Sequence, residues 1–249
     1  MKELYKYLDK RKSIRKIDKN NLINDDDLKK IKLLIDDLVP LFKEYIVRSE
    51  LVKNDQTTSK IGEYNLLIYS TKPNSKNTNH LLNIGYMFEQ LDLKLASINI
   101  GCCWLGLPKP KSNYKNDEYI IMLGLSKIKE EDLRKSKDEF NRKKLSDIWN
   151  GSFNEDVIYK ASLAPSACNS QSWKVKIENN NLLVYRDKNI KTIIPRSFRS
   201  FFNSIDLGIY LCFLEIALIY NNIKFDREII NNEMDKESLI LIARYKIYE

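Results

Sequence analysis

Two short stretches of the sequence gather the side chains best suited to hold a charged or polar ligand. Residues 164–175, APSACNSQSWKV, follow a proline with small polar residues, two amides and a tryptophan, so they are rich in hydrogen-bonding groups and poor in charge. Residues 11–18, RKSIRKID, place Arg11 and Arg15 in a basic cluster. Because arginine binds phosphate through paired, charge-assisted hydrogen bonds, this cluster could receive a phosphate.

Catalysis by side chains alone has little support in this sequence. The single histidine, His80, excludes zinc sites built from several histidines and leaves one possible base for a Ser–His–Asp or Cys–His arrangement. Neither GxxxxGK[ST] nor GxGxxG occurs, so a phosphate-loop nucleotidase or a Rossmann dehydrogenase is not supported. We expect His80 at a surface or helix start, and no metal site. An enzyme of this sequence would take its reactive group from a cofactor.

The composition is that of a globular protein with one large or two small domains. Of 249 residues, 43% are apolar and 31% are charged. The net charge of +8 comes mainly from dispersed lysines, which are typical of a solvated surface, and no nucleic-acid-binding module accompanies it. The N-terminus does not resemble a signal peptide. The four cysteines lack the pattern of a secreted disulfide framework, so we expect free thiols in the cytoplasm.

Apolar periodicity predicts a mixed set of helices and strands. The apolar run Leu207–Tyr220 has 14 residues and contains Glu215, too short for a membrane span, and we expect a buried helix and no membrane contact. Helices are predicted over 2–9, from Asp25 to about Pro40, and over 80–99, 154–163 and 206–223. Strands are predicted over 64–70, 118–124, 173–177, 182–186 and 238–248. We expect a turn at GCCWLGLP (101–108) and a charged linker at 128–144.

The segments 84–101 and 207–223 resemble each other. Each has a glycine near its start, large apolar residues and one acid, Glu89 or Glu215. This similarity suggests two halves that each give one central helix to a shared core, although any two buried helices look alike.

Three stretches together resemble the FMN-dependent nitroreductase family. RKSIR at 11–15 is similar to its Arg-x-Ser-x-Arg signature, and GCCWLG at 101–106 to its glycine-cysteine-tryptophan turn. PSACNSQSW at 165–173 is similar to its Pro-Ser-x-x-Asn-x-Gln-Pro-Trp, with Ser172 in place of the second proline. RKKLSDIW at 142–149 resembles, more weakly, the basic tail that closes the family's domain.

The resemblance implies an α+β nitroreductase-like fold, with central antiparallel sheets packed with helices. Family members are intertwined homodimers in which each proline-serine loop enters the partner's flavin site. Here the arginine signature lies in the first half and the loop in the second, so the chain resembles a dimer fused into one polypeptide with one flavin site. We expect halves at 1–145 and 146–249, which form one compact unit, and therefore a monomer.

The resemblance also assigns roles to individual residues. The phosphate end of FMN and the polar edge of its ring would be bound by Arg11, Ser13 and Arg15, with Arg142 as a further phosphate ligand. The Cys102–Trp104 turn, comprising Cys102, Cys103 and Trp104, would offer mainly backbone contacts. The loop from the second half would lie along the isoalloxazine ring through Pro165, Ser166, Ala167, Asn169 and Gln171.

The implied activity is a ping-pong oxidoreductase. NADH or NADPH would reduce the flavin, and the electrons would pass to a nitroaromatic, a quinone or a similar small acceptor. Flavin N5 would be the reacting atom, with no catalytic side chain required. Two alternatives remain at this point: a non-catalytic flavin-binding or flavin-sequestering protein, and an α+β interaction protein without a cofactor, whose arginines are surface charge.

Overall fold

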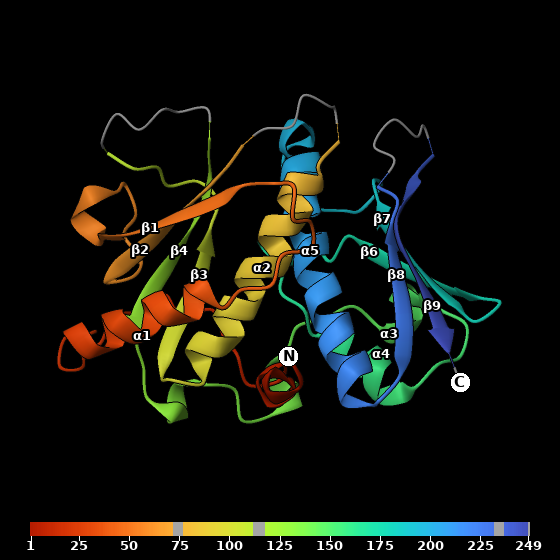
Figure 1. Ribbon diagram of the computed structural model, residues 1–249, viewed down its shortest axis with the longest axis horizontal. Coiled ribbons are helices and arrows are strands. Elements are labelled where there is room, and N and C mark those ends of the chain that lie inside the picture. The colour runs from red at the N-terminus through yellow and green to blue at the C-terminus, as the bar shows by residue number, and fades with distance from the viewer. Residues whose placement is uncertain (72–76, 112–117, 232–236, 249) are drawn as a thin grey trace.

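Two sheets lie at opposite ends of the molecule, and two long helices cross between them (Figure 1). The structure is a computed structural model that describes residues 1–71, 77–111, 118–231 and 237–248. The central helices are α2 (Asn79–Ala96) and α5 (Arg196–Tyr220). This arrangement confirms the predicted α+β architecture with sheets packed against helices.

The first sheet is antiparallel and has the strand order β1-β2-β4-β3. Its central strand β2, YNLLIYS, is almost wholly buried, as expected of a strand covered on both faces. Helix α1 begins with a capping box, in which Asn24 and Asp27 exchange side-chain and backbone hydrogen bonds. The bounds are α1 (Asp25–Asp36), β1 (Val47–Lys53), β2 (Tyr64–Ser70), β3 (Ile100–Leu105) and β4 (Tyr119–Lys127).

The second sheet has the order β5-β6-β7-β9-β8 and is antiparallel except for the short parallel pair β5 and β6. Asn179 and Asn180 join β6 to β7 with positive φ values of 48° and 60°, which a tight hairpin turn requires. The bounds are α3 (Leu145–Ile148), β5 (Trp149–Asn150), α4 (Glu155–Ser162), β6 (Trp173–Glu178), β7 (Asn181–Asp187), β8 (Lys224–Ile229) and β9 (Leu239–Tyr248).

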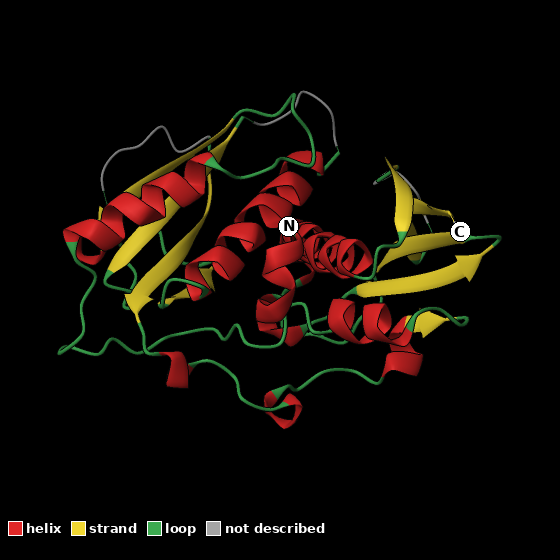
Figure 2. Ribbon diagram, turned by 60° about the horizontal axis from the view of Figure 1, so that its bottom comes forward, coloured by secondary structure: helices red, strands yellow, loops and turns green. Residues whose placement is uncertain are grey.

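The two central helices approach each other closely because each has a glycine at the crossing. A Cβ atom on Gly85 would lie 2.0 Å from the carbonyl oxygen of Ile205, and one on Gly208 would lie 2.0 Å from that of Leu82. Neither position has room for a side chain, so both backbones pack directly against each other. Figure 2 shows the central helices, in red, between the two groups of yellow strands, with green loop segments along the lower part of the view.

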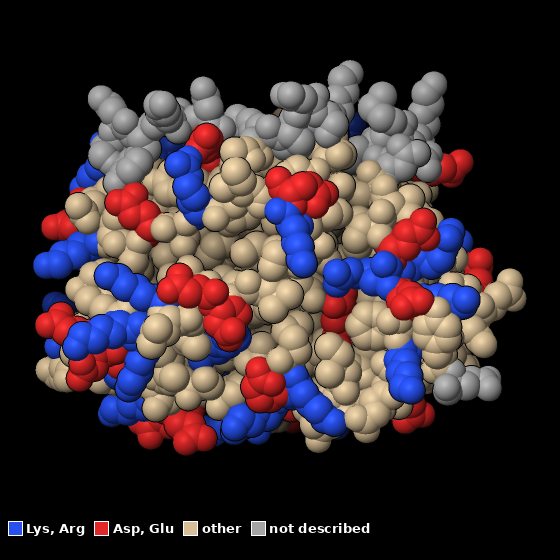
Figure 3. Space-filling view, in the orientation of Figure 1, with Lys and Arg blue, Asp and Glu red and all other residues tan. Residues whose placement is uncertain are grey.

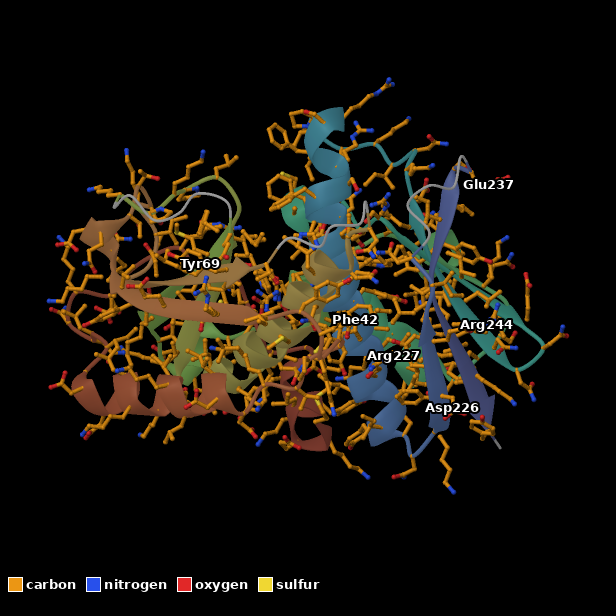
Figure 4. The ribbon with its side chains drawn as sticks, turned by 45° about the horizontal axis from the view of Figure 1, so that its top comes forward. Phe42, Tyr69, Asp226, Arg227, Glu237 and Arg244 are labelled. Atoms are coloured by element: carbon orange, nitrogen blue, oxygen red, sulfur yellow. The ribbon has the colours of Figure 1, made fainter. Side chains whose placement is uncertain are left out.

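A buried acid anchors α5 to the second sheet. Glu215 accepts hydrogen bonds from the hydroxyls of Tyr86 and Tyr245, both at 2.7 Å, and pairs with Arg227 at 2.6 Å. Figure 4 labels Arg227, which belongs to β8. These donors satisfy a carboxylate that burial would otherwise penalise.

Basic and acidic side chains are interspersed over the outer surface seen in Figure 3, as expected of a solvated surface.

The structure confirms the five predicted strands and differs from several other predictions. GCCWLGLP is not a turn, because its first five residues belong to strand β3 and pair with β4. Strands β1, β5 and β8 were not predicted, α1 ends at Asp36, and residues 2–7 form a 3-10 helix. The predicted linker carries two short 3-10 helices, Glu130–Asp132 and Lys137–Glu139.

Helix α5 begins earlier than predicted, at Arg196, and its apolar stretch is buried as predicted. Its length and composition would suffice for a membrane span, but 89% of its most apolar window is buried inside the fold. Each sheet lies beside one of the two central helices. The predicted similarity of the two halves of the chain, and their boundary between residues 145 and 146, stay predictions.

Candidate functional site

One cavity brings together residues from all three predicted site stretches. It has a volume of about 130 Å³ and lies beside the middle of α5. Ser13 and Arg15 line it together with Trp104, and Pro165, Ser166 and Ala167 line it from the second part of the chain. Residues up to 196 positions apart, from Ser13 to Ile209, therefore face one space, as the fused-site prediction requires.

Residues 11–15 reach the cavity because they run beside β3. The amide of Ile14 donates to the carbonyl of Cys102 at 3.0 Å, and Ser13 bridges the same strand residue. Gly101 allows this contact, since a Cβ atom there would lie 2.3 Å from Cγ1 of Ile14. Cys102 thus acts through its backbone. The thiols of Cys102 and Cys103 are buried and do not line the cavity, and burial raises the pKa of both.

Arg11 lies outside the cavity lining and is bound to two acids of α2. Its side chain is 2% exposed, with Nε 3.2 Å from Asp92 Oδ2 and 3.9 Å from Glu89 Oε1. Burial raises the pKa of both carboxyl groups, and the Arg11 charge opposes that shift. Arg11 also donates to the Ser13 hydroxyl at 3.1 Å. Its guanidinium is therefore engaged inside the protein, and the structure does not place it beside Arg15 as a cavity residue.

Glu89 also fixes the tryptophan of β3. The indole Nε1 of Trp104 donates to Oε2 of Glu89 at 3.1 Å, and Trp104 lines the cavity. The same carboxylate thus contacts Arg11 and Trp104, two of the predicted site residues.

Arg142 brings positive charge to the 165–171 loop, and Arg134 lies close to Arg142 across the ring of Phe140. Arg142 donates to the carbonyl of Leu163 at 2.9 Å and to Oδ1 of Asn169 at 3.2 Å. Both guanidinium groups lie over the ring of Phe140. Burial, followed by repulsion from Arg11, lowers the pKa of each to about 10. Neither forms an ion pair with a carboxylate within the described part of the chain, so a bound anion would relieve this repulsion.

The 165–171 loop has a strained backbone that several hydrogen bonds maintain. The backbone φ angles of Cys168, Asn169 and Gln171 are 50°, 53° and 46°, in the left-handed region that residues other than glycine seldom adopt. The amide of Gln171 donates to the Ser166 hydroxyl at 2.9 Å, and the amide of Lys143 donates to Oε1 of Gln171 at 2.9 Å. These contacts hold Asn169 and Gln171 outside the cavity lining, so the predicted loop residues do not all face one space.

Asp206 was not predicted and is the group that holds this loop against α5. Its carboxylate accepts from the amide of Ala167 at 2.8 Å and from the hydroxyl of Ser170 at 3.3 Å. Asp206 lines the cavity and is 3% exposed. Burial raises its pKa to about 7, although both hydrogen bonds favour the charged form. The only sequence signal was an acid at the start of a long apolar run.

The rest of the cavity wall is apolar. Ile121 lies on one side, with Ile205 and Ile209 of α5 among the other lining residues. Phe202 packs on Gly106, where a Cβ atom would lie 2.3 Å from its ring. The cavity thus offers charge, backbone hydrogen-bonding groups and apolar surface. Within the described residues, no group of three or more His, Cys, Asp or Glu side chains could hold a metal ion.

One family model matches most of this chain, and one solved structure has a similar fold. Residues 3–218 match the family model described as "Putative TM nitroreductase". The fold is similar to the crystal structure of a putative nitroreductase from Thermotoga maritima, with a TM-score of 0.63, 16% identity, and coverage of 98% of this chain and 93% of that chain. At that identity, the structural likeness concerns the fold alone. No curated protein matches the chain.

Proposed function

The chain belongs to the nitroreductase family that this model describes, and on that premise we propose that it is an FMN-dependent oxidoreductase. It takes electrons from NADH or NADPH and passes them to a nitroaromatic, a quinone or a similar small acceptor. The observation that carries the proposal is the cavity in which Ser13 and Arg15 meet Pro165, Ser166 and Ala167. A single polypeptide supplies both sides of this site, which supports a fused counterpart of the family dimer that works as a monomer.

The residues present fit the two chemically different ends of FMN. A phosphate needs cationic donors, and Arg15 is an exposed lining residue. Arg142 contacts Asn169 of the loop and has no carboxylate partner among the described residues. The flavin ring needs a flat apolar surface, which Ile121, Ile205 and Ile209 provide. The backbone of the proline-serine loop adds polar groups at the edge of that surface.

Each residue group has a distinct task in this proposal. Bound FMN supplies the hydride chemistry, which the side chains of this site lack. Arg15 and Arg142 hold the phosphate, and Arg11 positions Ser13 while it neutralises the acids of α2. Asp206 keeps the loop closed against α5, and the isoleucines exclude water from the reacting face.

The test is an anaerobic visible absorption spectrum of the purified protein, reconstituted with FMN if needed. We expect flavin bands that bleach when NADH or NADPH is added. Bands that persist with both donors would instead indicate a flavin-binding protein without this donor chemistry. A protein that stays colourless after incubation with FMN would refute the flavin assignment. Arg15→Gln/Arg142→Gln should bind FMN at least tenfold more weakly than the wild type.

A further inference from the structure

One surface of the molecule is built from two segments that are distant in the sequence. Residues 106–111 follow strand β3, and residues 189–199 lead into α5 and form its first turn. In Figure 1, α5 begins at the top of the molecule, the side toward which β3 runs. Phe202 of α5 connects the two segments, because a Cβ atom on Gly106 would lie 2.3 Å from its ring. We call this continuous surface the α5-start face.

Three large apolar side chains project from the α5-start face into solvent. Leu107 is 86% exposed, Ile193 is 85% exposed and Phe198 is 55% exposed. The first two are the most exposed large apolar residues in the described part of the chain. The ring of Phe198 lies 6.5 Å from that of Phe202, between centroids, so this apolar surface continues to the wall of the candidate site. Exposed apolar residues that cluster in this way mark an interaction site.

The charge of the α5-start face has one sign. Residues 189–205 contain three basic and no acidic residues, and residues 106–111 contain two lysines and no acid. Lys109, Lys191 and Arg196 are exposed, and no ion pair engages them within the described residues. Because α5 begins here, its dipole adds partial positive charge. This face therefore attracts anions, unlike the mixed surface of Figure 3.

We propose that the α5-start face docks on an anionic lipid bilayer. Leu107, Ile193 and Phe198 enter the headgroup region, and the surrounding cations contact the lipid phosphates. Apolar side chains among unpaired basic residues are the combination that holds a protein at such an interface. Projecting side chains enter a fluid bilayer without a matching pocket, whereas a protein partner would need a complementary surface of about 800 Å².

This docking goes beyond the proposed function and does not depend on it. It departs from the expectation of no membrane contact, which was drawn from the length of the apolar run at 207–220. That run is buried inside the fold, whereas the docking residues lie on the surface.

Co-sedimentation of the purified protein with lipid vesicles tests the charge of this face. We expect binding at least tenfold tighter to vesicles of phosphatidylcholine and phosphatidylglycerol in equal parts than to vesicles of phosphatidylcholine alone. Each cation near an anionic surface strengthens binding about fivefold, so Lys191→Gln/Arg196→Gln should weaken binding to the anionic vesicles at least tenfold. Lys32→Gln/Lys224→Gln removes the same charge at exposed positions outside this face and should bind as the wild type does.

A second pair of variants tests the apolar contact. Ile193→Ser/Phe198→Ser should also weaken binding to anionic vesicles at least tenfold, whereas Leu22→Ser/Leu33→Ser, at two exposed positions elsewhere, should not. Since all four side chains are exposed, circular dichroism should show an unchanged fold in both variants. No binding of the wild type to anionic vesicles would overturn the proposal and leave an acidic protein as the partner for this face. A loss of binding in either control as large as in its matched variant would overturn it as well.

Discussion

Replacing Asp206 with asparagine should stabilise the protein at neutral and alkaline pH and have little effect near pH 4. Asparagine keeps an oxygen that can accept from the amide of Ala167, and its NH₂ group can donate to the hydroxyl of Ser170. The substitution therefore preserves the contacts that hold the loop and removes only the buried charge.

The expected size follows from the pKa of Asp206, which burial raises from 3.8 to about 7 in the folded protein. Between these two values the folded state binds more protons than the unfolded state, so the wild type loses stability as pH rises. Each pH unit costs about 1.4 kcal/mol, which gives a total on the order of 4 kcal/mol. The asparagine variant escapes this loss, so its advantage should grow from about pH 4 and level off above pH 7.

Urea unfolding of both proteins between pH 5 and 8.5, without added flavin, measures the difference. Other carboxylates titrate in both proteins and cancel in the comparison. Asp36→Asn, at an exposed position of α1, controls for the loss of one negative charge. Asp206→Ala removes the acceptor of the Ala167 amide and should be about 1–3 kcal/mol less stable than Asp206→Asn. A stability difference between Asp206→Asn and wild type that does not change with pH would refute the reasoning.

Three further substitutions separate structural from ligand-binding roles. Arg11→Gln leaves two buried carboxylates without their cation and should lower the free energy of unfolding by about 3–5 kcal/mol, measured by urea unfolding; a loss below 1 kcal/mol would argue against the buried pairing. Arg15→Gln should change the free energy of unfolding by less than about 0.5 kcal/mol. It should weaken FMN binding by about 1.5–3 kcal/mol in a fluorescence titration, and an unaltered FMN affinity would exclude Arg15 as a ligand. Gly208→Ala places Cβ 2.0 Å from the carbonyl oxygen of Leu82 and should destabilise the fold by about 3 kcal/mol, so a neutral effect on the thermal midpoint would contradict the close helix crossing.

Secondary structure was predictable where apolar periodicity was strong and failed where tertiary contacts decide. The burial of β2 and α5 follows from long apolar runs. Strands β1 and β8 are sheet edges with charged residues at alternate positions, so their apolar signal is weak. Gly101 suggested a turn, but glycine is required there because Ile14 packs on the strand. That reason lies 87 positions away in the sequence and has no local signature.

The nitroreductase family was predictable from three motifs, and the family match confirms it. The roles of individual residues were less accessible. Arg11 and Arg15 are equivalent in the motif, and only the acids of α2 distinguish a buried ion pair from a cavity residue. Asp206 could not be found from the sequence because its role depends on the loop backbone that lies opposite.

The crossing of α2 and α5 also bears on the order in which the chain can fold during synthesis. Gly85 is made more than a hundred residues before its neighbour Ile205, so the first sheet and α2 leave the ribosome with their inner face uncovered. Contacts of such long range form late, because closing the intervening chain is entropically costly. Until α5 emerges, the nascent chain exposes apolar surface and is prone to aggregate. Slow translation just before α5 would therefore prolong a vulnerable state, and the cavity would be among the last features to form.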